Sequence, residues 1–158
     1  MQQLSEHFKL VEFCKHGAPP DDCLPLAQRM CQEVLEPIHT KFGTMPITSG
    51  YRPPDANAAI GGAKTSAHQW TPERCACDFQ VPGAHLPDVF DYIRKESYLP
   101  IDQVILESGK NQATETDDCI HLAFRRTMPR QMALIGETHG AGGYRQVPFI
   151  TADTSTPA

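Results

Sequence analysis

Apolar residues recur at helical spacing in two stretches of the chain. Within residues 24–42 an apolar side chain returns about every fourth position, so these side chains share one face of a helix. The positions are Leu26, Met30, Val34 or Leu35, and Ile38. Pro37 lies inside this stretch and predicts a kink or the end of the regular helix. Residues 86–98 repeat the pattern and predict a second helix.

Short apolar runs bounded by turn residues predict the strands of a sheet. They cover residues 45–49, 75–81, 103–107 and 119–125. Along the second run, alternation places Cys75 and Cys77 on the face opposite Asp78. Helices mixed with short strands, without a regular βαβ order, favour an α+β fold in which flanking helices cover a small antiparallel sheet.

The pattern weakens toward the C-terminus. Residues 129–135 predict a short helix, and residues 136–144 are rich in glycine. The tail at 151–158 is polar, and we expect it to be disordered. We therefore predict one domain over residues 1–130 and a C-terminal extension, partly disordered, over residues 131–158.

Composition limits the partners and the location of the protein. The chain has 158 residues, 40% of them apolar and 21% charged, which is typical of one globular domain. Its net charge of -5 argues against nucleic acid as a partner, because phosphate backbones attract basic surfaces. No run is long enough to span a bilayer, and the N-terminus lacks the basic and apolar regions of a signal peptide. We expect a monomer without a membrane partner, cytoplasmic as made.

Six cysteines are spread along the chain without a CxxC pair. Cytoplasmic thiols normally stay reduced, and free cysteine is among the most buried residue types, so we expect buried, unpaired thiols. Two alternatives stay open. One is a disulfide from Cys75 or Cys77 to Cys119, and the other is a structural zinc site on Cys75, Cys77, Cys119 and His121.

Residues suited to metal binding and acid–base chemistry gather in two separate segments. The first carries Arg52, His68 and Asp78, and the second carries Asp118 and His121. A catalytic zinc site needs three nitrogen or oxygen ligands and an open fourth position, with a carboxylate nearby as general base. Two histidines and one aspartate meet the first need. Asp118, three residues before His121, meets the second.

The order of these motifs resembles the zinc D-alanyl-D-alanine metallopeptidases, in particular the phage-type carboxypeptidases and endopeptidases of endolysins. The matching segments are SGYR at 49–52, NAAIGG at 57–62, SAH at 66–68, DQVILE at 102–107 and DDCIHLAF at 117–124. With the N-terminal segment LSEHFKLVEF, the resemblance covers residues 4–125. It implies a Hedgehog/DD-peptidase-like fold and bound Zn2+.

The resemblance also implies the roles of the central residues. It makes His68, Asp78 and His121 the zinc ligands. Asp118 becomes the general base, which takes a proton from the attacking water and passes it to the leaving amine. Asp117 is the adjacent alternative for the base.

Further roles concern residues around the ligands. Arg52 would orient the substrate or stabilise negative charge on the scissile carbonyl. Ser66 would hydrogen-bond to the substrate or to a ligand, and Glu107 would hold a ligand in place. Asp102 and Gln103 are weaker candidates for the same support.

One departure from the family lies between the first two ligands. The interval from His68 to Asp78 is longer than in the family, and Arg74 replaces a family glycine. The added residues predict a lengthened loop that brings Trp70 and Arg74 close to the metal. We expect this loop to decide specificity.

These observations predict a zinc-dependent peptidase that hydrolyses peptide bonds of bacterial peptidoglycan. It would act as a D-alanyl carboxypeptidase or as an endopeptidase of cross-bridges or stem peptides. A phage or prophage origin would let it act on the cell wall after release or as part of a virion. The alternative is a non-catalytic virion, structural or binding module that retains the peptidase fold.

Overall fold

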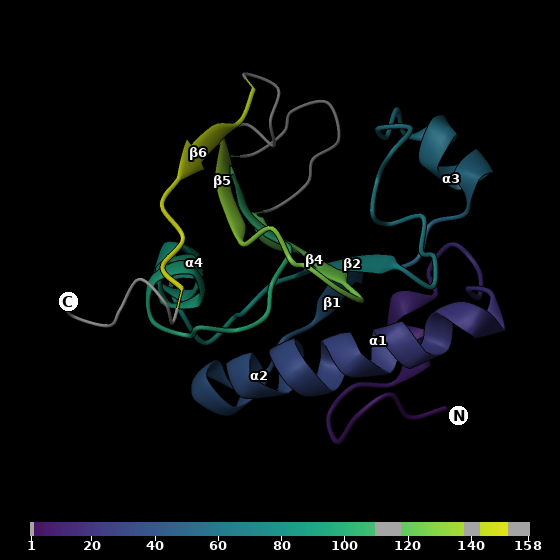
Figure 1. Cartoon of the computed structure of the whole chain (residues 1–158), viewed down its shortest axis with the longest axis horizontal. Helices are drawn as coiled ribbons and strands as arrows, with labels where there is room; N and C mark the ends of the chain where they lie inside the picture. The colour runs from purple at the N-terminus through teal and green to yellow at the C-terminus, as the bar shows by residue number, and fades with distance from the viewer. Residues whose placement is uncertain (1, 110–117, 138–142, 152–158) are drawn as a thin grey trace.

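The computed structural model describes residues 2–109, 118–137 and 143–151. These segments form an α+β fold, as predicted, in which one sheet has its main helices on one side (Figure 1). No helix among them has the length and apolar composition needed to cross a membrane. Part of the glycine-rich segment and nearly all of the tail predicted to be disordered lie outside the described residues.

Six strands form the sheet in the order β1-β2-β4-β3-β5-β6. They are β1 (Ile47–Ser49), β2 (Arg74–Phe79), β3 (Gln103–Ser108), β4 (Cys119–Arg125), β5 (Met132–Glu137) and β6 (Arg145–Val147). Neighbouring strands run antiparallel except β3 and β5, which are parallel. The mostly antiparallel sheet is therefore confirmed, and its four predicted strands are all present.

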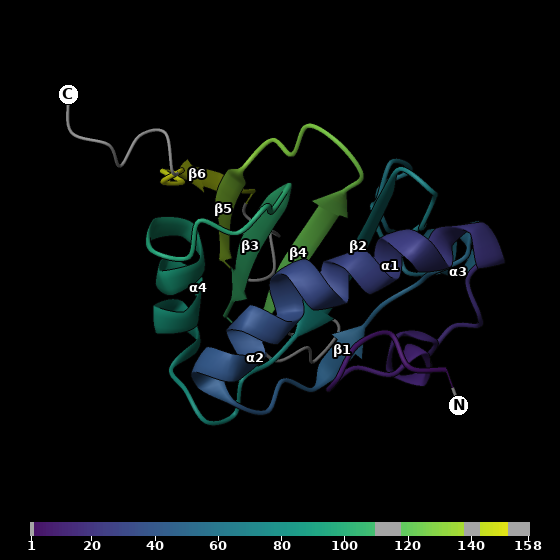
Figure 2. The same cartoon turned by 60° about the horizontal axis from the view of Figure 1, so that its bottom comes forward.

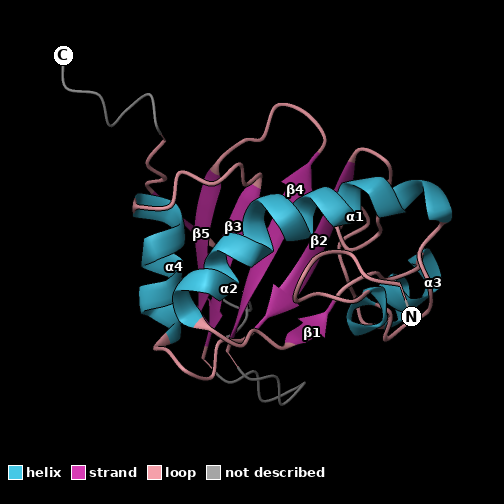
Figure 3. Cartoon of the chain, turned by 90° about the horizontal axis from the view of Figure 1, so that it is seen from below, coloured by secondary structure: helices cyan, strands magenta, loops and turns pink. Residues whose placement is uncertain are grey.

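The helix predicted at 24–42 is confirmed as one continuous helical rod. It consists of α1 (Leu24–Met30), the π-helical turn η3 (Cys31–Leu35) and α2 (Glu36–Phe42). Pro37 lies in the first turn of α2, directly after the wide π turn, so the helix continues past a residue that has no N–H to donate. Figures 2 and 3 show this rod crossing the strands.

Two further helices complete the fold, besides the short 3-10 turns η1 (Leu10–Phe13) and η2 (Asp21–Cys23). The second predicted helix is α4 (Leu86–Lys95), which packs beside α2 through an edge-on contact between Phe42 and Tyr92. The short helix α3 (Pro54–Ala59) lies on the other side of the sheet (Figure 1). The helical layer therefore leaves the opposite face of the sheet to α3 and the loops.

The face of the sheet beneath the helices carries the apolar core. Cys75, Cys77 and Phe79 of β2 are 0% exposed there, and they alternate with Asp78 on the opposite face. This arrangement confirms the predicted alternation.

The two cysteine-based alternatives are wrong. All six cysteines are free, so no disulfide joins β2 to Cys119. A zinc site on Cys75, Cys77, Cys119 and His121 would need ligands from both faces of the sheet, because the thiols of β2 lie in the core while His121 shares the face of Asp78.

Most of the segment predicted as a short helix at 129–135 belongs to the strand β5 (Met132–Glu137) instead. β5 pairs in parallel with β3, and Ala133, opposite Val104, is fully buried. A run this short fits either periodicity, so pairing with a distant strand decides its conformation. The predicted boundary at 130–131 consequently falls inside the connection between two strands of one sheet.

Candidate functional site

Asp78 and His121 face each other across two central strands. They are direct partners in the antiparallel register of β2 and β4, on the face away from α1 and α2. Oδ1 of Asp78 lies 2.9 Å from Nδ1 of His121. Nε2 of His68, which comes from the loop before β2, lies 3.2 Å from each of these two atoms. The structure thus brings together the three residues predicted as metal ligands.

Local packing holds His68 in one orientation. The side chain is 3% exposed, and its Nδ1 lies 2.8 Å from the carbonyl oxygen of Gly50. A carbonyl oxygen can only accept a hydrogen bond, so Nδ1 is the donor in this contact and Nε2 is the nitrogen that faces Asp78 and His121. The backbone N–H of Arg52 donates to the carbonyl of His68 at 2.8 Å and fixes the loop further. A histidine held in this way can bind a metal through Nε2.

The charges around the ligands favour an ionised carboxylate. Burial by itself would raise the pKa of Asp78, but the charges and hydrogen bonds of His68 and His121 outweigh it and lower that pKa well below its usual range. Burial lowers the pKa of Arg52, while the charge of Asp78 acts in the opposite direction. Nε of Arg52 is buried and has no hydrogen-bond partner within the described segments. The site therefore combines an anionic carboxylate, which is predicted to be a ligand, with a buried guanidinium.

The donor set fits a zinc ion. Donor atoms of a tetrahedral zinc site with bonds near 2.0 Å lie roughly 3.3 Å apart. The three donor atoms of His68, Asp78 and His121 are 2.9, 3.2 and 3.2 Å apart. Two imidazoles and one carboxylate leave the fourth position open, as in catalytic zinc sites.

A second group of possible ligands lies near the N-terminus and has a structural explanation. His7, Glu36 and His39 offer donor atoms within 4.8 Å of one another. Glu36, however, already accepts hydrogen bonds from the hydroxyl of Ser5 and from the backbone of His7, and its second oxygen lies 2.7 Å from Nδ1 of His7. These contacts tie the N-terminal segment to α2.

A family model described as Peptidase M15 matches residues 6–111. The chain belongs to the Peptidase M15 family. The match confirms the resemblance to the zinc D-alanyl-D-alanine metallopeptidases at the family level and supports a peptidase, a hydrolase that acts on peptides. M15 peptidases are typically zinc-dependent, in agreement with the donor set. No curated protein matches the chain. The family match ends before β4, so it includes His68 and Asp78 but not His121.

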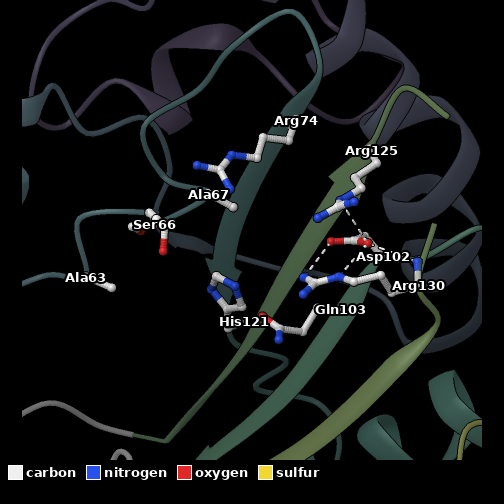
Figure 4. Close-up of a pocket in the computed structure, with 10 residues that line it drawn as sticks. Ala63, Ser66, Ala67, Arg74, Asp102, Gln103, His121, Arg125 and Arg130 are labelled. Atoms are coloured by element: carbon white, nitrogen blue, oxygen red, sulfur yellow. Dashed lines mark hydrogen bonds and ion pairs between the residues drawn. The ribbon is translucent and has the colours of Figure 1, made fainter. Parts of the chain in front are cut away.

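A cavity of about 310 Å³ opens beside His121 in this M15 peptidase (Figure 4). Ser66, Asp102 and Gln103, all predicted to support the site, line it. The hydroxyl of Ser66 also accepts a hydrogen bond from the backbone N–H of His68 at 3.3 Å. Ser66 is thus placed where it can contact both a ligand and a bound peptide.

The predicted base, Asp118, directly precedes β4 and is exposed. It lines a different cavity from His121, together with Gln80 and Leu86. The side-chain amide of Gln80 donates to the carbonyl of Asp118 at 3.1 Å and fixes the backbone at this point. The alternative base, Asp117, lies outside the described residues.

The second predicted carboxylate, Glu107, lies on the sheet face that carries the ligands. It is opposite Cys119 in the register of β3 and β4, two positions from His121. The hydroxyl of Tyr144 donates to Glu107 at 3.0 Å. Burial and this neighbouring carboxylate raise the pKa of Tyr144 to about 12. No sequence motif pointed to Tyr144, because this residue comes after β5 and only the folded structure brings it beside Glu107.

Trp70 and Arg74, the two side chains that were predicted to lie close to the metal, have different surroundings. Trp70 is 4% exposed, packs against Phe13 and Tyr51, and donates from Nε1 to the carbonyl of Ala76 at 2.9 Å. It does not line the cavity beside His121, because burial of the large ring places it in the core. Arg74 does line that cavity.

Proposed function

We propose that this M15 peptidase is a zinc-dependent enzyme that hydrolyses peptide bonds of bacterial peptidoglycan. It acts as a D-alanyl carboxypeptidase or as an endopeptidase of cross-bridges or stem peptides. The proposal rests on the arrangement of His68, whose Nδ1 is occupied by the carbonyl of Gly50 and whose Nε2 meets Asp78 and His121. In that arrangement three potential donor atoms lie close together, as a metal site requires, in a chain that belongs to a peptidase family.

The proposed roles follow from position and charge. His68, Asp78 and His121 hold Zn2+, which polarises the scissile carbonyl and activates a water molecule when it is bound. Arg52, buried beside Asp78, stabilises the negative charge that develops on the carbonyl oxygen. Ser66 hydrogen-bonds to the substrate from the wall of the cavity.

Proton transfer is assigned to Asp118. It takes the proton from the attacking water and delivers it to the leaving amine. The support for this role is its position, three residues before His121 in one continuous segment. Glu107, on the same sheet face as His121, supports the ligands and is the carboxylate with which Asp118 has to be compared.

The test uses the zinc-loaded protein on purified peptidoglycan and on the stem pentapeptide L-Ala-γ-D-Glu-L-Lys-D-Ala-D-Ala. Mass spectrometry of the products distinguishes release of D-alanine from cleavage within the stem or the cross-bridge. We expect Asp118→Ala to lower kcat by about 100-fold or more while zinc content stays normal. Asp21→Ala, which removes an exposed carboxylate at η2, is the matched control. Equal turnover by the wild type and Asp118→Ala on several wall types would contradict the enzymatic proposal.

Glu107→Gln completes this comparison. We expect a smaller loss than for Asp118→Ala, because Glu107 supports the site without transferring the proton. The opposite order, with Glu107→Gln inactive and Asp118→Ala active, would move the general base to Glu107.

The alternative of a non-catalytic binding module is favoured by one observation, the exposed position of Asp118 in a cavity separate from that of His121. This alternative predicts zinc binding and co-sedimentation with peptidoglycan without any product.

Because the proposed substrate lies in the cell wall, we also propose that the protein acts after release or as part of a virion, as a phage or prophage enzyme would.

A further inference from the structure

The cavity beside His121 is basic at the end away from the metal ligands. Arg74, Arg125 and Arg130 line it, and Asp102 is its acidic member (Figure 4). Three arginines against one carboxylate leave an excess of two positive charges, in a chain whose net charge is -5. A local field of this sign attracts anions.

Asp102 serves to position the arginines. It is 3% exposed, and both of its oxygens accept hydrogen bonds from the guanidinium of Arg130, at 3.0 and 2.8 Å. It also accepts from the backbone N–H of Arg130 at 2.9 Å and lies 3.2 Å from Nε of Arg125. Because its oxygens are used in these contacts, Asp102 holds two guanidinium groups in place without neutralising all three.

Arg74 and Arg125 form the part of this basic end that is available to a ligand. They are direct partners in the register of β2 and β4, where like charges are unfavourable. Arg74 makes no ion pair with a carboxylate in the part of the chain that the structure describes. A bound anion between the two guanidinium groups would remove the repulsion.

The same register connects this basic end to the metal ligands. Arg74 and Arg125 lie on the sheet face of Asp78 and His121, one alanine pair, Ala76 and Ala123, away along the strands. Four residues of strand correspond to about 13 Å between His121 and Arg125. Thr65 and Ser66 line the cavity together with the arginines, and Figure 4 shows Ser66 there.

We propose that Arg74 and Arg125 bind a carboxylate of the substrate peptide two or three residues from the scissile bond. This proposal rests on the proposed peptidase function. Guanidinium groups bind carboxylates through paired hydrogen bonds. Two or three residues of an extended peptide span about 7–11 Å, and the side chains of the arginines and of the substrate cover the rest of the separation of about 13 Å. In wall stem peptides the carboxylate can come from the glutamyl residue or from a diaminopimelate in the third position.

The test compares pairs of peptides that differ only in one carboxylate. The first pair is L-Ala-γ-D-Glu-L-Lys-D-Ala-D-Ala with a free or an amidated glutamyl α-carboxylate. The second pair carries meso-diaminopimelate in place of lysine, with its side-chain carboxylate free or amidated. For one of the two pairs we expect kcat/KM to favour the free carboxylate by about tenfold, since hydrogen bonds between charged groups are strong.

Arg74→Gln should reduce this preference to near unity. Arg126→Gln is the matched control, because Arg126 is the next residue after Arg125, pairs with Glu73 at 2.9 Å and does not line the cavity. We expect it to keep the preference of the wild type. A preference that survives in Arg74→Gln, or that is absent from both peptide pairs, would overturn the proposal while leaving the peptidase function intact.

Calorimetry measures how tightly the protein binds the same peptides. It therefore distinguishes failure of the subsite proposal from failure of the proposed peptidase function. If the protein cleaves neither pair but binds one free carboxylate more tightly, and Arg74→Gln abolishes the difference, the subsite is supported and the peptidase function is not. Normal zinc content and an unchanged melting temperature of Arg74→Gln establish that the variant is folded. Equal binding of free and amidated peptides by the wild type would count against the subsite.

Discussion

The Nδ1 atom of His68 lies 2.8 Å from the carbonyl oxygen of Gly50, eighteen positions earlier in the chain. Gly50 in turn lies against Phe13, where a Cβ would come 2.5 Å from the Cα and the carbonyl oxygen. The next residue, Tyr51, donates its backbone N–H to that carbonyl at 2.9 Å. The histidine that we propose as a metal ligand is thus oriented by the carbonyl of Gly50, a position that leaves no room for a side chain.

Gly50→Ala should therefore damage stability and metal binding together. Overpacking against Phe13 is expected to cost about 1–3 kcal/mol of unfolding free energy. Displacement of the Gly50 carbonyl should weaken zinc binding by about 10- to 100-fold, as loss of a partner behind a metal ligand does. Urea unfolding and a zinc titration measure the two effects. Gly83→Ala is the control, because its nearest neighbour is the carbonyl of Phe42 at 3.8 Å.

Removal of a ligand should abolish tight zinc binding. We expect the wild type to retain zinc through dialysis and His68→Ala and His121→Ala to lose it, since two donors hold zinc far less tightly than three. His16→Ala, at an exposed histidine, should retain it. Elemental analysis of the purified proteins gives the result. Zinc retained in both ligand variants would contradict the proposed centre.

Trp70 should be needed for stability because of its hydrogen bond as well as its size. Trp70→Phe keeps most of the ring packing but leaves the carbonyl of Ala76 without the indole donor. We expect a loss of about 1–3 kcal/mol in unfolding free energy. Tyr98→Phe, at a side chain that is 46% exposed, should change it little. A Trp70→Phe protein as stable as the wild type would show that this contact contributes nothing.

Asp102 should give the protein acid sensitivity. Burial would raise its pKa, but hydrogen bonds and charge from Arg130 outweigh burial and lower it. A carboxyl whose pKa is lowered on folding stabilises the protein above its unfolded pKa of about 4, and this contribution disappears as the pH falls through the folded pKa. The melting temperature of Asp102→Asn should therefore lie below that of the wild type between pH 5 and 8.

The difference between the two proteins should shrink as the pH falls below about 4. Asp88→Asn, at an exposed position on α4, provides the control and should follow the wild type throughout. A difference between Asp102→Asn and the wild type that stays constant down to pH 2 would exclude the Asp102 carboxylate as its source.

Local patterns predicted much of the fold correctly. The four-residue apolar spacing between Leu26 and Ile38 located the rod formed by α1 and α2, because helix geometry depends on neighbouring residues alone. Alternation in β2 placed Asp78 opposite the buried Cys75 and Cys77 for the same reason. β5 was predicted as a helix because its strand conformation depends on pairing with β3, which no local pattern records.

The sequence by itself determined which functional groups this protein has and how they are spaced along the chain: the motif order, the residue types and the spacing of Asp118 before His121. Only the tertiary structure decided which groups meet. The β2–β4 register places Asp78 beside His121 and Arg74 beside Arg125, and the turn at Gly50 orients His68. Such contacts join residues far apart in the chain, and long-range strand pairing and packing, rather than local propensity, determine them.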